Sequence, residues 1–193
     1  MARSPVHVED ARPDDADALV EVWGGAGGRA PAVPGQEAAS SIARIASEPD
    51  ERLLVARVDG RVAGAVHLLR APLSPVHAES AVYMVHLHVL EEFRRHGVGM
   101  ALVEGAVSWA EEKDSPHVLT AASASSRDAN RFMARLGLGQ VAIVRGATTA
   151  AVRAKLPVET PAVAAADRRT HRNVGTVLAK RRSMRRAGQT PPS

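Results

Sequence analysis

Apolar residues recur along this chain with two spacings, one typical of β-strands and one typical of α-helices. Short apolar or alternating runs predict strands at 7–11, 52–58, 61–69, 81–90 and 117–123. Apolar residues three and four positions apart predict helices at 13–23, around Ala38 to Ile45, after Val98 and after Ser126. Strands and helices that alternate in this way predict an α/β fold.

Turn residues mark the ends of several of these elements. Asp59-Gly60 separates two predicted strands and is the strongest hairpin signal in the sequence. The segment 24–36 is rich in glycine and proline, which predicts a loop. The run 81–90 is apolar at nearly every position, so we expect a central strand that is buried on both faces.

The last part of the pattern predicts two further strands and then a tail. Residues 139–145 and 148–156 read as strands on either side of Gly146. We therefore expect a domain that spans residues 1–157. Residues 158–193 form a basic tail that we expect to be partly helical or disordered.

Composition narrows the classes of function. The chain has 193 residues, 45% of them hydrophobic, which fits one domain plus a tail. It has no cysteine, which excludes disulfides, a thiol nucleophile and a thiolate metal site, and its histidines lack metal-ligand spacing, so we expect no metal. We find neither a secretion signal nor an apolar run of the roughly 18 residues that cross a bilayer. We expect a cytoplasmic protein with no membrane partner.

Charge is distributed unevenly. Residues 1–163 hold 17 Lys and Arg against 20 Asp and Glu, whereas residues 164–193 hold 8 against 1, so the net charge of +4 comes from the tail. A tail helix over 170–186 would have enough apolar surface to dock on the domain or on the second subunit of a homodimer. The tail has no aromatic residue for base stacking, so nucleic acid is not its expected partner.

The stretch Arg94-Arg95-His96-Gly97-Val98-Gly99 lies between a predicted buried strand and a long predicted helix. Such a turn exposes backbone N–H groups at the positive end of the helix dipole, where a phosphate binds. Leu102 stands where a dinucleotide fingerprint needs glycine, and no Gly-Lys-Ser/Thr follows as in a nucleoside-triphosphate loop. The residues predict a site for a different phosphate ligand, or a turn that the glycines merely shape.

This stretch, with Val89 before it and Ala101-Leu102 after it, resembles the acetyl-CoA-binding segment of the GNAT N-acetyltransferase superfamily. Residues 129–138, Ala-x-x-Phe-Met-x-x-x-Gly-Leu, resemble the second cofactor segment of that family. The resemblance covers residues 6–156. It implies an α/β fold with a mixed sheet of six to seven strands, helices on both faces, and acetyl-CoA in a split between the strands 81–90 and 117–123.

The resemblance also implies roles for single residues. Arg94 would lie beside the pyrophosphate, which would be held by the backbone amides of Arg95, His96, Gly97, Val98, Gly99 and Met100. Leu87 and Val89 would offer backbone groups to the pantetheine arm and the thioester carbonyl. In the second segment, Ser126 stands where many members have Asn, and Met133 where they have the Tyr that protonates the leaving thiolate. The usual general acid is missing, although a thiol of pKa about 8.5 is a tolerable leaving group.

An ammonium acceptor must lose a proton before it attacks the thioester, which requires a base. His86 is the first candidate, with Tyr83, or Glu79 through a water, as alternatives; Tyr83 is also the one tyrosine available to replace the missing acid. In a regular strand His86 and His88 share a face opposite Tyr83, and a β-bulge would reverse that parity. Packing or hydrogen bonding alone would account for each of these side chains equally well.

These observations predict an acetyl-CoA-dependent N-acetyltransferase that moves the acetyl group directly to a primary amine of a small molecule or peptide. No covalent enzyme intermediate is expected, because no cysteine exists to carry one. The alternative is a catalytically idle acyl-CoA-binding or interaction module whose basic tail contacts a partner or nucleic acid.

Overall fold

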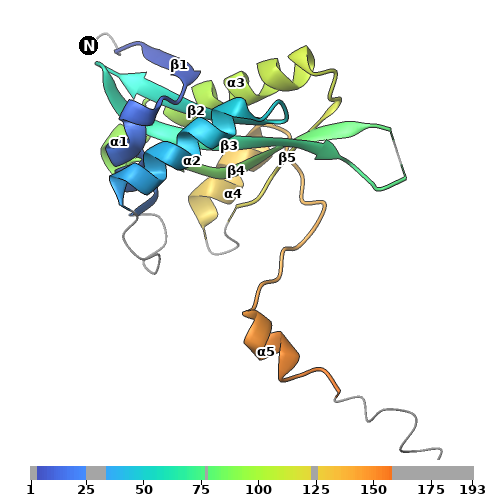
Figure 1. Cartoon of the computed structure of the whole chain (residues 1–193). Helices are drawn as coiled ribbons and strands as arrows, with labels where there is room; N and C mark the ends of the chain where they lie inside the picture. The colour runs from blue at the N-terminus through green and yellow to red at the C-terminus, as the bar shows by residue number, and fades with distance from the viewer. Residues whose placement is uncertain (1–3, 25–33, 77, 123–125, 158–193) are drawn as a thin grey trace, which may run out of the picture. The chain divides into compact units, whose positions relative to one another are not determined.

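The computed structural model describes residues 4–24, 34–76, 78–122 and 126–157. In these residues one sheet has the strand order β1-β2-β3-β4-β5 (Figure 1). Its strands are β1 (Val6–Asp10), β2 (Glu51–Val58), β3 (Arg61–Pro72), β4 (Ser80–Val89) and β5 (His117–Thr120). Neighbouring strands are antiparallel except for β4 and β5, which are parallel.

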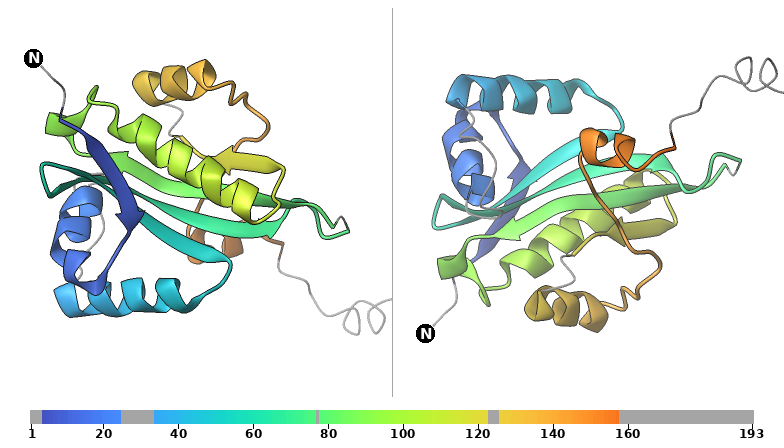
Figure 2. Two further views of the ribbon diagram at one scale, coloured as in Figure 1. Left: turned by 90° about the horizontal axis from the view of Figure 1, so that it is seen from above. Right: turned by 90° about the horizontal axis from the view of Figure 1, so that it is seen from below.

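Helices cover both faces of the sheet (Figure 2). The 3₁₀ turn η1 (Pro13–Asp15), α1 (Ala16–Gly24) and α2 (Gly35–Ser47) lie on one face, and α3 (Val98–Glu112) and α4 (Arg127–Arg135) lie on the other. A second 3₁₀ turn, η2 (Glu91–Phe93), joins β4 to the segment before α3. Leu19, Ile42 and Val55 belong to the apolar cluster on the first face. Met84 and Leu102 belong to the larger cluster on the second face, so the expected α/β class is confirmed.

The hairpin between β2 and β3 follows the sequence signal. Asp59 and Gly60 both have positive φ, 49° and 78°, as a two-residue type I′ turn requires. Val58 pairs with Arg61 directly across this turn. The predicted hairpin is therefore confirmed. A type I′ turn also matches the right-handed twist of the two strands that it joins.

The number of strands is smaller than expected. The sheet has five strands and not six to seven, because 139–145 contains no strand and 149–153 is the short helix α5 (Thr149–Arg153). The Thr148 hydroxyl caps this helix by accepting a hydrogen bond from the Ala151 amide at 3.2 Å. Alanine, which favours a helix, is the commonest residue of 148–156, at positions 150, 151 and 154. The prediction of strands at 139–145 and 148–156 was wrong.

The chain divides into a compact unit, Met1–Ile143, and a second unit that begins at Val144. The elements of the sheet and α1 to α4 all belong to the first unit. Residues 25–33 of the predicted loop, the tail 158–193 and its predicted helix over 170–186 lie outside the described residues. Among the residues that are described, no helix combines the length and apolar character that crossing a bilayer requires.

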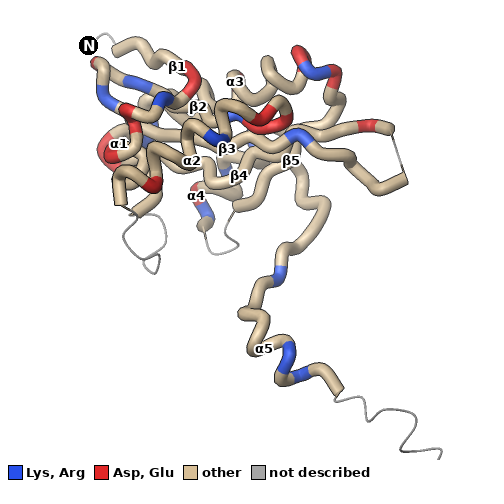
Figure 3. Tube along the Cα trace, viewed as in Figure 1, with Lys and Arg blue, Asp and Glu red and all other residues tan. Residues whose placement is uncertain are grey.

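Ion pairs connect β1, η1 and β2 at one end of the sheet, where blue and red segments adjoin in Figure 3. Arg57 donates to Glu9 and to the buried Asp15, each at 2.6 Å, and these hydrogen bonds raise the pKa of Arg57. Asp15 also accepts the Arg12 amide at 2.9 Å, which completes the start of the helix. The N-terminal helix signal is confirmed, and the ion pair between Arg57 and Asp15 holds the start of the helix against the sheet.

We expect Asp15→Asn to destabilise the protein by about 1.5–2 kcal/mol, since a partly buried charged hydrogen bond to Arg57 becomes a neutral one. Urea unfolding measures this change. Asp14→Asn is the control, because Asp14 precedes Asp15 in the same turn but is exposed. Equal stability of the two variants would contradict the assigned role of Asp15.

Candidate active site

The central feature of the site is a β-bulge in β4. The register between β3 and β4 shifts between Ala65, which pairs with His88, and His67, which pairs with Val85. His86 has a positive φ of 55°, which costs a residue with a side chain about 1 kcal/mol. After the bulge, Leu87 packs toward the cluster that contains α3. The reversal of side-chain parity considered for this strand is therefore present, and His88 lies on the face of α1 and α2.

The bulge lies just beyond the point where the pairing between β4 and β5 ends. β5 pairs with β4 only from Ala81 to Met84, and the Thr120 hydroxyl donates to the Met84 carbonyl at 3.0 Å. Beyond Met84, β4 has β3 on one side and no paired strand on the other within the described residues. The Leu90 amide donates to Ala63 of β3, so the alternation of a strand directs the Val89 amide to the free edge.

The segment after β4 presents a row of free backbone amides. Gly97 caps α3 with a φ of 90°, and the first amide that donates back to it is that of Ala101, to the Gly97 carbonyl. From Arg95 to Met100, no backbone amide donates to a protein group in the described part of the chain. The His96 ring donates to the Arg94 carbonyl at 2.9 Å, which holds the turn in shape. Free N–H groups at the positive end of a helix are the arrangement that anion binding requires.

Close packing sets the position of this turn against β4. A Cβ atom on Gly64 of β3 would lie 2.6 Å from the His88 carbonyl oxygen and 3.1 Å from Val98. A Cβ atom on Gly99 would contact Phe132 of α4 at 3.5 Å and Val89 at 3.8 Å. The start of α3 therefore lies next to the bulge and next to α4. The free amides and the free edge of β4 are adjacent as a result.

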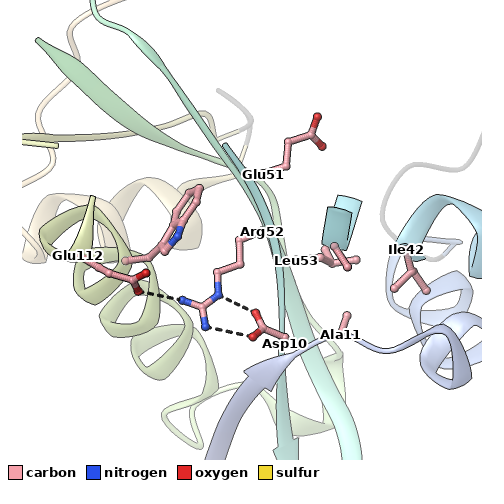
Figure 4. Close-up of a pocket in the computed structure, with 9 residues that line it drawn as sticks. Asp10, Ala11, Ile42, Glu51, Arg52, Leu53 and Glu112 are labelled. Atoms are coloured by element: carbon pink, nitrogen blue, oxygen red, sulfur yellow. Dashed lines mark hydrogen bonds and ion pairs between the residues drawn. The ribbon is translucent and has the colours of Figure 1, made fainter. Parts of the chain in front are cut away.

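A hollow in the surface lies away from these residues. It measures about 310 Å³ and is lined by residues of β1, α2, β2 and α3 (Figure 4). Arg52 crosses it, with hydrogen bonds to Asp10 at 2.6 and 3.1 Å and an ion pair to Glu112 at 3.8 Å, and its pKa is raised by the bond to Asp10. These charges satisfy one another, and none of the predicted site residues lines the hollow.

Comparison with known proteins bears on this geometry. The sequence model of the acetyltransferase (GNAT) family matches residues 20–138, more than half of the chain. The chain belongs to the GNAT acetyltransferase family. The matched segment contains the bulge, the free amides and α4, and membership confirms the expected enzyme class, an acyltransferase. No curated protein sequence matches the chain.

Solved structures confirm the GNAT fold. An acetyltransferase from Agrobacterium tumefaciens str. C58 is 21% identical, with a TM-score of 0.66 over 74% of this chain and 99% of its own. Glucosamine-6-phosphate N-acetyltransferase from Arabidopsis thaliana is 15% identical, with a TM-score of 0.66 over 75% and 99%. The aminoglycoside N-acetyltransferase AAC(6')-Iy in complex with CoA is 15% identical, with a TM-score of 0.64 over 76% and 95%.

Four other predicted site residues of this GNAT chain lie in β4 and α4 or directly before them. Glu79 precedes β4, and its carboxylate lies 3.5 Å from Nε2 of His117 at the start of β5, at the opposite end of β4 from the bulge. The Ser126 hydroxyl caps α4 by accepting the Ala129 amide at 3.3 Å. Met133 is buried in α4. Tyr83 is half-buried within the paired part of β4.

Two histidines and a tryptophan lie at the bulge itself. His86 is exposed, and its ring meets the edge of Trp23 of α1 at a centroid distance of 6.5 Å. His88 is half-buried, and burial, then the positive charge of Arg94, lowers its pKa below the ordinary 6.5. Sequence reasoning placed His88 on this strand but ranked His86 above it, because the pattern of residues carries no signal for the burial of a single side chain. In the predicted helix 13–23, apolar spacing gives Trp23 no role beyond that of an apolar residue on one helix face.

Proposed function

We propose that this GNAT acetyltransferase transfers the acetyl group of acetyl-CoA directly to a primary amine of a small molecule or peptide. The observation that carries the proposal is the row of six free amides beside the free edge of β4. The six amides suit the diphosphate of acetyl-CoA, and the free edge of β4 suits its extended, amide-containing arm. AAC(6')-Iy, solved in complex with CoA, has the same fold.

The residues present fit acetyl-CoA. The amides from Arg95 to Met100 would hold the diphosphate, with the guanidinium of Arg94, which is more than half exposed, beside it. The amides of Leu87 and Val89 would serve the arm and the thioester carbonyl. Acetyl-CoA supplies an activated acyl group. A fixed N–H aimed at its carbonyl oxygen stabilises the charge that develops there by about 3 kcal/mol, by analogy with other oxyanion donors.

The base has two candidates on the same strand. The amine nitrogen bonds to the acetyl carbon while the carbon–sulfur bond breaks, and the proton lost by the amine needs an acceptor. His88 has the lowered pKa and is therefore neutral and able to accept a proton at about pH 7. His86 is exposed beside the same bulge. We assign the base to His88, with His86 as the alternative.

The lowered pKa of His88 leads to a pH prediction. Between that pKa and 6.5 the unfolded chain binds more protons than the folded one at this position, so stability rises with pH across this window and the gain is complete above 6.5. We expect His88→Gln to remove this part of the slope of melting temperature against pH. The acid limb of the transfer rate should disappear in the same variant and persist in His86→Gln. The reverse result for the two variants would assign the base to His86.

The identity of the acid follows from what surrounds the site. Met133 is buried and has no proton to give, and Tyr83 lies within the paired part of β4. The leaving thiolate, with a pKa of about 8.5 for a simple thiol, then takes its proton from solvent. We infer that this enzyme works without a dedicated general acid.

A panel of amines tests the proposal. Two proteins of the same fold are named for aminoglycosides and for glucosamine-6-phosphate, which are both amine-bearing sugars. Release of free thiol from acetyl-CoA should accelerate with at least one amine of a panel that includes aminoglycosides, amino sugars and peptide N-termini. Tight binding of acetyl-CoA with no acceleration by any amine would favour the idle acyl-CoA-binding module instead.

A further inference from the structure

The bulge carbonyl of β4 is held by a side chain from another element. The indole Nε1–H of Trp23, near the end of α1, donates to the carbonyl oxygen of His86 at 2.8 Å. The indole and the His86 ring also meet edge to face, with an interplanar angle of 71°. Neither His86 nor Leu87 is paired in register with β3. Within the described residues, Trp23 is therefore the side chain that fixes the orientation of this peptide group.

This carbonyl belongs to the same peptide unit as the Leu87 amide. A trans peptide is planar, and its C=O and N–H point in opposite directions, so a bond that fixes one fixes the other. Because Trp23 holds the His86 oxygen, the Leu87 hydrogen points away from α1. A hydrogen bond accepted by the carbonyl also polarises the N–H of the same unit and makes it a better donor.

We propose that Trp23 is a positioning residue for acetyl transfer, which aims and polarises the Leu87 amide at the thioester oxygen. The inference rests on the proposed function, and it gives Trp23, which also packs against the apolar cluster under α1 and α2, a second role. The positive φ of His86 is an unfavourable conformation for a residue with a side chain, and no pairing with β3 holds it there. The hydrogen bond from the Trp23 indole therefore maintains this conformation. Trp23 would act on the reaction through this peptide unit.

Kinetics of a conservative variant provide the first test. Trp23→Phe keeps an aromatic ring and removes the N–H donor, and Trp109→Phe makes the same change in the buried core of α3. With acetyl-CoA alone, whose hydrolysis to free thiol needs no identified amine, we expect Trp23→Phe to lower kcat about tenfold while the Kd for acetyl-CoA changes less than twofold. Trp109→Phe should leave both values unchanged. Parallel losses in the two variants, or an unchanged kcat in Trp23→Phe, would overturn the proposal.

Amide NMR provides a test that does not depend on turnover. In the unsubstituted protein, the Leu87 resonance should differ between saturation with acetyl-CoA and saturation with CoA, which lacks the carbonyl. In Trp23→Phe this difference should shrink by at least half, and an undiminished difference would refute the role of Trp23. If Leu87 in the unsubstituted protein does not distinguish the two ligands while both bind, the inference fails and donor binding stands. If neither ligand binds, the proposed function fails and the inference fails with it.

Discussion

Gly97→Asp should weaken binding of acetyl-CoA about 100-fold. Gly97 has a φ of 90°, a conformation that a residue with a Cβ adopts at a cost of about 1–3 kcal/mol, and the new carboxylate would lie among the amides assigned to the diphosphate. Repulsion between the two anions adds to the loss, and about 2.7 kcal/mol in total corresponds to the expected factor. Titration calorimetry with acetyl-CoA measures the change.

The chain offers a matched control for this variant. Gly60 also has a positive φ, 78°, and also has no atom within 4 Å of the position of a Cβ. It lies in the hairpin between β2 and β3. Gly60→Asp should therefore lower stability through the same backbone strain and leave the Kd for acetyl-CoA within twofold. Equal losses of affinity in both variants would show that strain, and not the anion site, determines the effect of Gly97→Asp.

Gly64→Ala should lower acetyl transfer about 100-fold with a smaller effect on the donor Kd. The new methyl carbon would lie 2.6 Å from the His88 carbonyl oxygen and 3.2 Å from the Val89 Cα, so the backbone of β4 must move just beyond the bulge. Overpacking of this kind costs about 1–3 kcal/mol of stability. A displacement of about 1 Å in the groups that position a reaction is enough for the expected loss of rate.

Gly105→Ala is the control for crowding in general. A Cβ at Gly105 in α3 would meet the ends of the Leu54 and Val8 side chains at 3.0 and 3.3 Å, and these ends can shift. The gain in helix propensity offsets part of that cost. We expect transfer by Gly105→Ala within twofold of the unsubstituted protein. If Gly64→Ala also kept its rate, the geometry of the bulge would not matter for the reaction.

The sequence predicted those parts of the fold that local chemistry determines. Asp59-Gly60 predicted a hairpin because a type I′ turn needs positive φ at both residues. Ser125 or Ser126 predicted a helix start because a serine hydroxyl can accept a backbone amide, as that of Ser126 does. The strands 139–145 and 148–156 were wrong, since alternation alone does not supply a neighbouring strand, and the alanines around Val152 favour a helix.

The candidate site divides in the same way. The glycine turn at 97–99 could be predicted because free amides at a helix start are a property of the local chain. The bulge at His86, the bond from Trp23 and the burial of His88 depend on contacts between residues far apart in sequence, such as Gly64 and His88. No spacing within one strand encodes them, and so the base and the positioning residue emerge only from the structure.

We propose that the free amides at the start of α3 and along the free edge of β4 together hold acetyl-CoA. Amide NMR with stepwise addition of acetyl-CoA tests it most directly. We expect saturable shifts for the amides of Arg95 to Met100 and for Leu87 and Val89, all with one common Kd. Binding of acetyl-CoA that leaves these resonances in place and shifts those around Arg52 instead would contradict it.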